Sequence, residues 1–464
     1  MNSINKLFRT ASIYLIGNVL SKIFAFLLIP LYTNYISSND YGIYDITVSI
    51  LTLVIPLVFF QIWDGIFRFI YDFEKEEDKY KIVNNGLCVC LISIVLYELL
   101  FIIVAILFNF PFKILVNIYG ITIALQYIFG TAARTFKKNK LYMCTGVINT
   151  FINLSLNIIL ILVLKKANIG SLYFSIIMGN IIQCCIIARR LRIFKNFKKN
   201  DISKNIIKKM IRFSIPIAIS TISYWLLSGY TKIIVSKNLS YSSNGVFAIA
   251  TRLASIITLV VSVLQMAWHE ISFESANSKD RKNFYQKGLN MFLLYLSIGT
   301  AIAIMIIKVV FPYIVNGEYI TAKNIIPIVL IYTAINAFSG FSSSQFLAEK
   351  NSKIPLYTTL ISAILNIFIS VILINKYKLL GAASSLLICF SLNTISRMYF
   401  LHKDYKIKFN KYYILLSICL FIASSVSYYC FNNIVNMILT ITLLGVIIFK
   451  NKKIIIEILE RRKV

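Results

Sequence analysis

The sequence has little charge for its length, and most of the charge that it has is positive. Only 14% of its 464 residues are charged, 58% are hydrophobic, and the mean hydropathy is +0.77. A soluble domain carries about 25% charged residues, so this composition excludes a water-soluble fold and a disordered chain. A chain of this length has room instead for more than ten membrane spans of about 20 residues each.

Enzyme motifs and metal-binding clusters are missing from the sequence as well. It contains no G-x-x-x-x-G-K-S/T phosphate loop, no H-E-x-x-H motif and no G-x-S-x-G motif. The two histidines, His269 and His402, lie far apart, and none of the eight cysteines forms a C-x-x-C pair. We therefore predict a protein that is not an enzyme and holds no metal or cofactor. Transport by such a chain would require an H⁺ or Na⁺ gradient or a partner.

Long apolar segments are what the sequence has in abundance. Backbone polar groups in lipid must be satisfied within each segment, so we expect these segments to be helices. The sequence predicts an all-α polytopic membrane protein with about 14 transmembrane helices. The predicted spans are 11–36, 42–70, 86–108, 114–133, 141–164, 171–188, 211–236, 245–270, 289–311, 325–348, 354–374, 379–401, 412–430 and 433–449.

Positive charge alternates between the segments that connect these spans. With the N-terminus inside, the inside connections hold 35 Lys and Arg residues, and the outside connections hold 7. The positive-inside rule then predicts that both termini are cytosolic. The segment 189–212 alone holds ten basic residues. We interpret it as a cytosolic linker that lies on anionic membrane lipids, and we expect no nucleic acid as a partner.

A weak internal repeat relates the two halves of the chain. Arg9 and Arg212 each open the first helix of a six-helix block, and segment 36–44 resembles segment 239–247, both at an offset of 203 residues. Because six is even, the blocks share one orientation, as two lobes related by a parallel pseudo-two-fold axis do. The predicted division is an N-lobe at 1–190, a basic linker at 191–210, a C-lobe at 211–402, two extra helices at 411–450 and a basic tail at 451–464.

Polar side chains follow one face of several predicted helices. In 245–270 they recur at alternating spacings of four and three residues, which is the spacing of one helical face. We expect them to line a shared hydrated cavity, and interhelical packing remains the alternative. The candidate lining residues are Asn18, Asn149, Asn153, Ser255, Thr258, Ser262, Gln265, Asn366 and Asn393.

Charged residues inside the spans are candidates of a second kind, because an uncompensated charge at mid-membrane costs about 2.5–3.5 kcal/mol. Lys22 and Arg252 come from opposite halves of the chain, and we expect them to meet an anionic ligand. Glu98 and Asp64 are candidates for coupling to an ion or for pairing, Glu98 with Lys22 and Asp64 with Arg68. Snorkelling toward the membrane surface is expected of Lys232, Glu270, Lys308 and Arg397.

Three short patches carry a family resemblance. They are Leu7-Phe8-Arg9 with Gly17-Asn18, Lys22 and Pro30 in the first span, the turn at 37–44, and Gly65-Ile66-Phe67-Arg68-Phe69 at the end of the second span. With its layout of six, six and two helices, the chain resembles the Wzx-type flippases of O-antigen and capsule repeat units. These polysaccharide exporters share a superfamily with multidrug-extrusion proteins and lipid II flippases.

The resemblance implies two lobes around a V-shaped cationic cavity in a bacterial plasma (inner) membrane. It implies that an undecaprenyl-diphosphate-linked oligosaccharide moves to the outer leaflet by alternating access. Lys22, Arg68 and Arg252 would hold the diphosphate, and the last two helices would hold the lipid tail. Glycan polymerase and assembly proteins are the implied partners.

Other functions remain open at this point. Lipid II flippases are richer in arginine in the first helix, where this chain has only Lys22, so the choice between lipid II and another glycan is not made by the sequence. A cation-coupled multidrug or metabolite antiporter of the same superfamily is the second alternative. A membrane glycosyltransferase and a scaffold of glycan assembly are the others.

Overall fold

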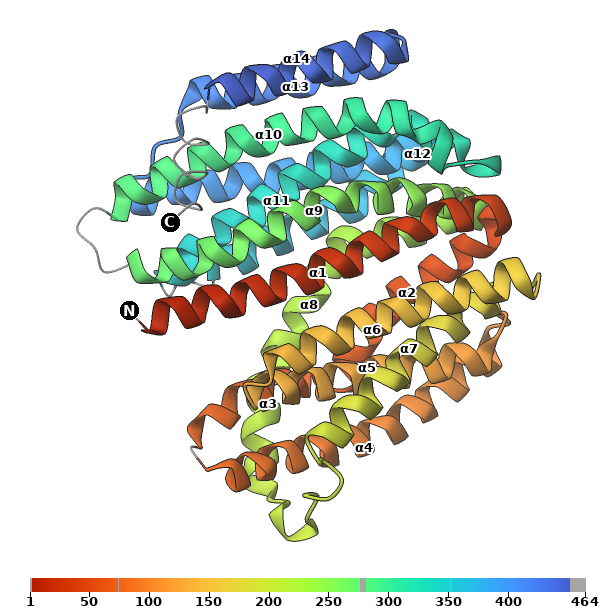
Figure 1. The fold of residues 1–464 in the computed structure, drawn as a ribbon, viewed down its shortest axis with the longest axis vertical. Helices are drawn as coiled ribbons and strands as arrows, with labels where there is room; N and C mark the ends of the chain where they lie inside the picture. Colours follow the sequence, from red (N-terminus) through yellow and green to blue (C-terminus); the bar gives the residue numbers. More distant parts are fainter. Residues whose placement is uncertain (1, 74, 276–280, 350, 352, 451–464) are drawn as a thin grey trace. The chain divides into compact units, whose positions relative to one another are not determined.

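The computed structural model is a helical protein, and it describes residues 2–73, 75–275, 281–349, 351 and 353–450 (Figure 1). Within these ranges there are fourteen α-helices and no strand, and eleven helices are long and apolar enough to cross a membrane. The predicted all-α polytopic fold is therefore confirmed. The helices are α1 (Asn2–Tyr35), α2 (Ser38–Val58), α3 (Ile62–Phe69), α4 (Glu76–Leu107), α5 (Lys113–Thr135), α6 (Asn139–Ile158), α7 (Ile169–Arg190), α8 (Lys204–Asn238), α9 (Tyr241–Ser275), α10 (Arg281–Ile314), α11 (Ile326–Ala348), α12 (Lys353–Tyr405), α13 (Lys411–Cys430) and α14 (Asn433–Lys450).

The chain forms two compact units. The first comprises Met1–Ile249 and Thr359–Ala382, and the second comprises Ala250–Thr358 and Ala383–Val464. In the first unit α6 packs against α1 and α7, and α2 packs against α8. In the second unit α10 packs against α11, α13 and α14 (Figure 1). The lobes predicted from the repeat are a different division of the chain, and they stay a prediction.

The predicted span 42–70 is broken into α2 and α3. Phe60 and Gln61 lie between these helices with φ angles of 52° and 46°, in the left-handed region. The Gln61 N–H donates to the Pro56 carbonyl over 2.7 Å, and the Phe60 N–H donates to the Leu57 carbonyl over 3.1 Å. These bonds close the end of α2 in the way that a Schellman motif does. The flanking Phe59 and Ile62 are fully buried, as irregular backbone at membrane depth requires.

The predicted spans 354–374 and 379–401 are joined in α12 by a sharp kink. Lys378 has a φ of 53° and a ψ of −129° at this point. A Cβ added to Gly381 would lie only 1.9 Å from the Leu373 carbonyl oxygen. Glycine therefore lets the two halves of α12 approach at the kink more closely than any side chain would allow.

Candidate functional site

The starts of α2 and α9 meet inside the first unit, at two glycines that the repeat aligns. A Cβ added to Gly42 would lie 1.8 Å from the Tyr241 carbonyl oxygen, and one added to Gly245 would lie 2.0 Å from the Ser38 carbonyl oxygen. The offset of 203 residues relates Gly42 to Gly245 and Ser38 to Tyr241, so the contact is reciprocal. The hydroxyls of Ser38 and Ser242 are also hydrogen-bonded to each other. We call this contact the glycine crossing.

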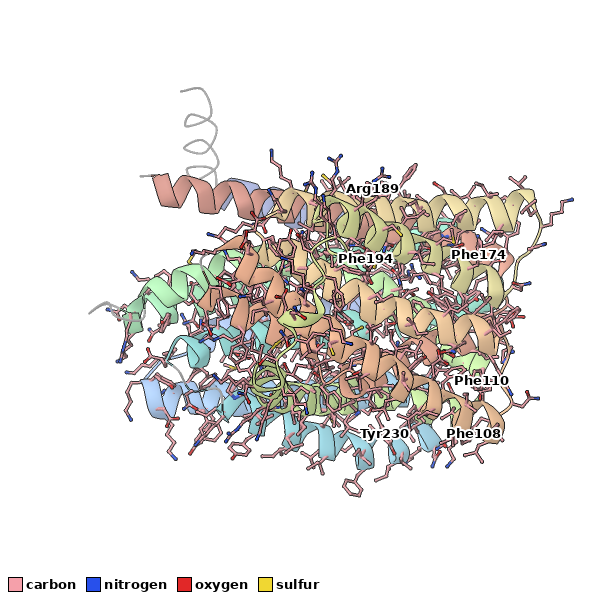
Figure 2. The ribbon with its side chains drawn as sticks, turned by 90° about the horizontal axis from the view of Figure 1, so that it is seen from below. Phe108, Phe110, Phe174, Arg189, Phe194 and Tyr230 are labelled. Carbon is pink, nitrogen blue, oxygen red and sulfur yellow. The ribbon has the colours of Figure 1, made fainter. Side chains whose placement is uncertain are left out.

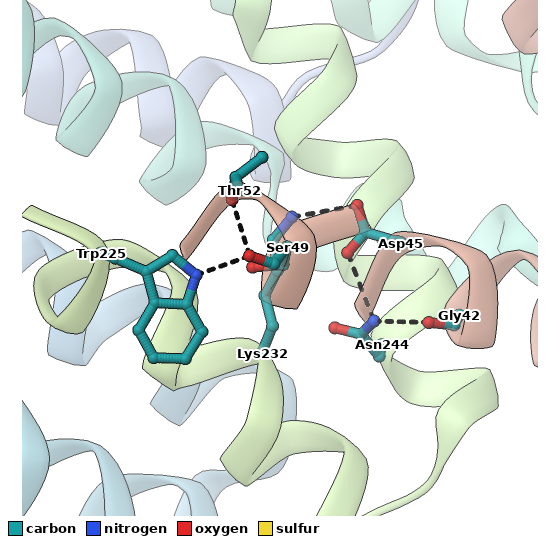
Figure 3. A network of polar contacts seen from close by, with 7 residues as sticks. All are labelled: Gly42, Asp45, Ser49, Thr52, Trp225, Lys232 and Asn244. Carbon is teal, nitrogen blue, oxygen red and sulfur yellow. Dashed lines mark hydrogen bonds and ion pairs between the residues drawn. The ribbon is translucent and has the colours of Figure 1, made fainter. Parts of the chain in front are cut away.

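An ion pair lies beside the glycine crossing (Figure 3). Lys232 Nζ in α8 lies 2.9 Å from Asp45 Oδ1 in α2, and the two side chains are 21% and 18% exposed. Asn244 Nδ2 in α9 donates to the Gly42 carbonyl over 2.9 Å and to Asp45 Oδ2 over 3.3 Å. The expectation that Lys232 snorkels is therefore wrong, because Asp45 satisfies its charge within the protein. One carboxylate joins three helices here.

The contact between α2 and α8 continues further along both helices. Trp225 Nε1 donates to the Ser49 carbonyl over 2.7 Å, and Thr52 Oγ1 donates to the same carbonyl over 2.6 Å (Figure 3). At the break between α2 and α3, Thr221 Oγ1 donates to Gln61 Oε1 over 3.0 Å. Buried polar groups need partners in a membrane, and these bonds fix α8 along the length of α2.

The charged residues of α3 pair differently from the prediction. Asp64 Oδ2 accepts a hydrogen bond from Gln61 Nε2 over 2.7 Å, at the start of the helix. Arg68 Nη1 lies 2.8 Å from Asp72 Oδ1, and both side chains are about half exposed. Asp64 and Arg68 therefore do not pair with each other, because each reaches toward its own end of this short helix. The guanidinium of Arg68 remains accessible from solvent.

The other predicted charges occupy separate places. Glu98 Oε2 accepts from Asn117 Nδ2 in α5 over 2.8 Å, and the pairing of Glu98 with Lys22 stays a prediction. Lys22 is half-buried in α1 of the first unit, and Arg252 is half-buried in α9 of the second unit. Binding of an anionic ligand by Lys22, Arg68 and Arg252 stays a prediction.

Two of the predicted lining residues make hydrogen bonds between helices. Asn149 Nδ2 in α6 donates to Asn180 Oδ1 over 2.9 Å and to Gln183 Oε1 over 2.7 Å, both in α7. Asn366 Nδ2 in α12 donates to Thr231 Oγ1 in α8 over 3.0 Å, and Asn366 is fully buried. These side chains have the packing role that the sequence left open.

The hydroxyl groups of α9 bond within their own helix. Ser255, Thr258 and Ser262 each donate to the carbonyl three residues earlier, over 2.6 to 2.8 Å, and all three are half-buried, as Gln265 is. Asn153 accepts from Asn157 in the same helix, and Asn393 is 3% exposed. The side chains of Asn18, His269 and Glu270 lie outside the described part of the chain. A shared cavity stays a prediction.

Arg397 in α12 is buried in the second unit and does not snorkel. It is 6% exposed, and it donates to the Ser339 carbonyl over 2.7 Å, to Ser343 Oγ over 2.6 Å and to Thr358 Oγ1 over 3.1 Å. Lys308 Nζ, near the end of α10, donates to the Phe431 carbonyl at the end of α13, and its snorkelling stays a prediction. A cation is favourable at that end of a helix. Both cations therefore hold helices together.

The ion pair of Asp45 and Lys232 was missed as a pair by reasoning from the sequence. A signal was present, because Gly42 and Asn244 lie in the two segments that the repeat aligns. Charged residues in adjoining parts of the spans could have been matched to these segments. Asp45 and Lys232 are 187 residues apart in the sequence, so a rule based on spacing along one helix does not detect the pair.

The sequence and the fold were compared with known proteins in three ways. A family model described as polysaccharide biosynthesis protein matches residues 7–269, and the model MatE matches residues 216–372. No curated protein matches the sequence. The fold is similar to that of the lipid II flippase MurJ in an inward closed conformation, with a TM-score of 0.72, 16% identity and coverage of 95% of this chain and 99% of that one.

Two further structures are similar at lower scores. An inward-facing multidrug resistance transporter of the MATE family has a TM-score of 0.61, 14% identity and coverage of 89% of this chain and 94% of its own. A MOP superfamily transporter from Pyrococcus furiosus has a TM-score of 0.61, 13% identity and coverage of 90% and 96%. Such identities show the fold alone. The polysaccharide biosynthesis model, however, covers more than half of the chain, and the chain therefore belongs to the polysaccharide biosynthesis protein family.

Proposed function

We propose that this protein flips undecaprenyl-diphosphate-linked oligosaccharide repeat units from the cytosolic to the outer leaflet of a bacterial plasma membrane, in O-antigen or capsule biosynthesis. The observation that carries the proposal is the match of the polysaccharide biosynthesis family over residues 7–269. The fold shared with a lipid II flippase supports the same chemistry, because that protein's named substrate is also lipid-linked. A glycan polymerase and assembly proteins would act on the product.

Lys22, Arg68 and Arg252 are the cations proposed to hold the diphosphate. Charge-assisted hydrogen bonds from ammonium and guanidinium groups to phosphate are about twice as strong as neutral ones. Arg68 is half exposed near the end of α3, which suits a first encounter with the headgroup. Lys22 and Arg252 are half-buried, so they would bind the diphosphate in a later step, after it has left water.

The glycine crossing is proposed to close the outer side of the transporter. With the N-terminus in the cytosol, α2 and α9 both begin at the outer face. The two repeats would then be held together there by Gly42, Gly245, Asn244 and the ion pair of Asp45 with Lys232. Outward opening by rocking of the repeats would require these contacts to separate. Coupling to H⁺ or Na⁺ would supply the free energy, with Asp64 and Glu98 as the candidate carboxylates.

The proposal is tested by deleting the gene and measuring surface glycan and lipid-linked intermediates in the same cells. Loss of glycan display with intermediates on the inner leaflet is the expected result. Lys22→Glu and Arg252→Glu should then fail to restore display, whereas the exposed Lys403→Glu should restore it. Accumulated lipid II would indicate a lipid II flippase. Normal display and unchanged intermediates, in a strain without a second flippase, would instead indicate an antiporter and direct attention to Glu98 and Asp64.

A further inference from the structure

The basic segment between the repeats is a fixed part of the first unit. Leu191 and Ile193 are buried, and Tyr80 Oη in α4 donates to the Leu191 carbonyl over 2.7 Å. Asn84 Nδ2 in α4 donates to the Asn196 carbonyl over 3.0 Å. The adjacent Asn85 makes two hydrogen bonds to the end of the same segment. Its Nδ2 donates to the Asp201 carbonyl, and its Oδ1 accepts from the Ser203 N–H. We call residues 191–203 the linker loop.

A polar cavity of about 420 Å³ lies between the linker loop and the first turns of α4. Five cations line it: Lys81, Lys138, Arg190, Arg192 and Lys198. Lys81 is paired with Asp78 over 2.8 Å. The other four make no ion pair with a carboxylate of the described residues. Within the part of the chain that the structure describes, four cationic groups therefore line this polar space without a carboxylate in ion-pair contact.

The same cavity also presents carboxylates. Glu76, Glu77 and Asp78 stand in the first turn of α4, where the helix dipole favours negative charge. Asp201 completes the acidic lining, and its Oδ2 accepts from Asn84 Nδ2 over 2.9 Å. A simple inorganic anion would meet these carboxylates at a cost. A ligand that carries both a phosphate and hydroxyl groups could use both kinds of lining.

An exposed aromatic side chain places the linker loop beside lipid. Phe194, labelled in Figure 2, is 72% exposed. Its ring and that of Phe129 form an edge-to-face contact, with centroids 6.2 Å apart. Phe129 lies six residues before the end of α5 at Thr135, so Phe194 is level with the apolar body of that helix. Arg189 precedes the cavity cation Arg190 at the end of α7. An exposed aromatic ring beside basic groups is typical of a segment at the membrane interface.

We propose that the cavity beneath the linker loop binds the headgroup of an anionic phospholipid that bears hydroxyl groups, with phosphatidylglycerol as the probe. Arg190, Arg192 and Lys198 hold the phosphate, the carboxylates of α4 accept hydrogen bonds from the glycerol hydroxyls, and Phe194 lies against the acyl chains. Since the site is formed by α4, the end of α7 and the linker loop, this binding does not depend on which substrate the protein transports.

Tryptophan quenching in lipid nanodiscs tests the site with the full-length protein. Phe194→Trp places a reporter on the linker loop, while the native Trp63, Trp225 and Trp268 are each less than 10% exposed. Brominated phosphatidylglycerol or brominated phosphatidylcholine is titrated into unlabelled phosphatidylcholine over the same range of fractions. We expect half-maximal quenching by phosphatidylglycerol at an at least ~10-fold lower fraction, because each basic residue near a phosphate adds to the attraction.

Two triple variants decide whether the cavity is responsible. In R190Q/R192Q/K198Q the preference for phosphatidylglycerol should disappear. In K403Q/K408Q/K411Q, which removes three charges from another basic segment, the preference should remain. Equal quenching by both lipids, or a preference that survives the first triple variant, would overturn the site. Equal binding of brominated phosphatidic acid, which lacks the glycerol hydroxyls, would overturn the role given to the carboxylates. Thermal unfolding of both triple variants checks that they are folded.

Discussion

Lys232 and Asp45 form an ion pair across α2 and α8, with Nζ 2.9 Å from Oδ1 and about four-fifths of each side chain buried. An exposed pair contributes about 0–1 kcal/mol, whereas breaking a buried pair costs about 3–5 kcal/mol. We expect Asp45→Asn or Lys232→Met to lower the free energy of unfolding by ~1–3 kcal/mol, between these limits.

A double-mutant cycle measured by thermal unfolding in detergent checks this expectation. The double variant D45N/K232M should lose less than the sum of the two single variants, since no charge is left without its partner. Strict additivity would show that the two side chains do not interact.

A disulfide across the glycine crossing should stop transport reversibly. The hydroxyls of Ser38 and Ser242 are hydrogen-bonded, so cysteines at these positions lie close enough to be oxidised. In a background in which the eight native cysteines are replaced by serine, oxidation of S38C/S242C should abolish glycan display, and a reductant should restore it.

The matched control is N238C/N375C. Asn238 Nδ2 donates to Asn375 Oδ1 over 2.8 Å, and both residues belong to the second repeat. Oxidation of this pair should leave display unchanged. If the crossing disulfide forms and export continues, the crossing does not open during transport.

Gly42→Ala should open the glycine crossing. Its Cβ would lie 1.8 Å from a backbone oxygen that cannot rotate away. Overpacking of this kind costs about 1–3 kcal/mol, which corresponds to a roughly 5- to 150-fold larger open population. Labelling of Ser38→Cys by a membrane-impermeant maleimide, again without the native cysteines, should accelerate accordingly. Gly299→Ala is the control, since nothing lies within 4 Å of its Cβ. Equal labelling in the two alanine variants would contradict the close contact.

Arg397→Lys should destabilise the second unit even though it keeps the charge. The guanidinium reaches two carbonyls and two hydroxyls of α11 and α12, and one ammonium group cannot reproduce this fork. We expect a loss of about 1–3 kcal/mol in the free energy of unfolding. The exposed Lys403→Arg should change it by less than ~0.5 kcal/mol. Equal stability of the two variants would show that the fork is not needed.

The helical spans could be predicted because apolar runs are a local property of the sequence, and the repeat, which stays a prediction, rests on a regular offset. Apolar runs locate helices in lipid, and the offset of 203 residues aligns Gly42 with Gly245, which the structure brings into contact. The break at Phe60 and Gln61 could not be predicted in this way. Neither residue is glycine or proline, and the left-handed backbone there is imposed by tertiary packing.

The hydrogen-bond partners of the polar residues could not be predicted from the sequence either. A stripe such as Ser255, Thr258 and Ser262 has the same periodicity whether its hydroxyls face water or their own carbonyls. In the sequence, Arg397 lies near the end of a predicted span. Only the structure shows that its guanidinium is buried against α11. Periodicity identifies a face of a helix, but it does not identify what that face contacts.

At the glycine crossing, neither Gly42 nor Gly245 has space for a larger side chain. Glycine is already the smallest residue, so neither repeat can make room for a larger side chain in the other by giving up atoms of its own. Elsewhere, the two repeats predicted from the sequence can change independently of each other wherever their surroundings differ. At Gly42 and Gly245 the two repeats are in direct contact, so a larger residue at either position displaces the backbone of the other repeat.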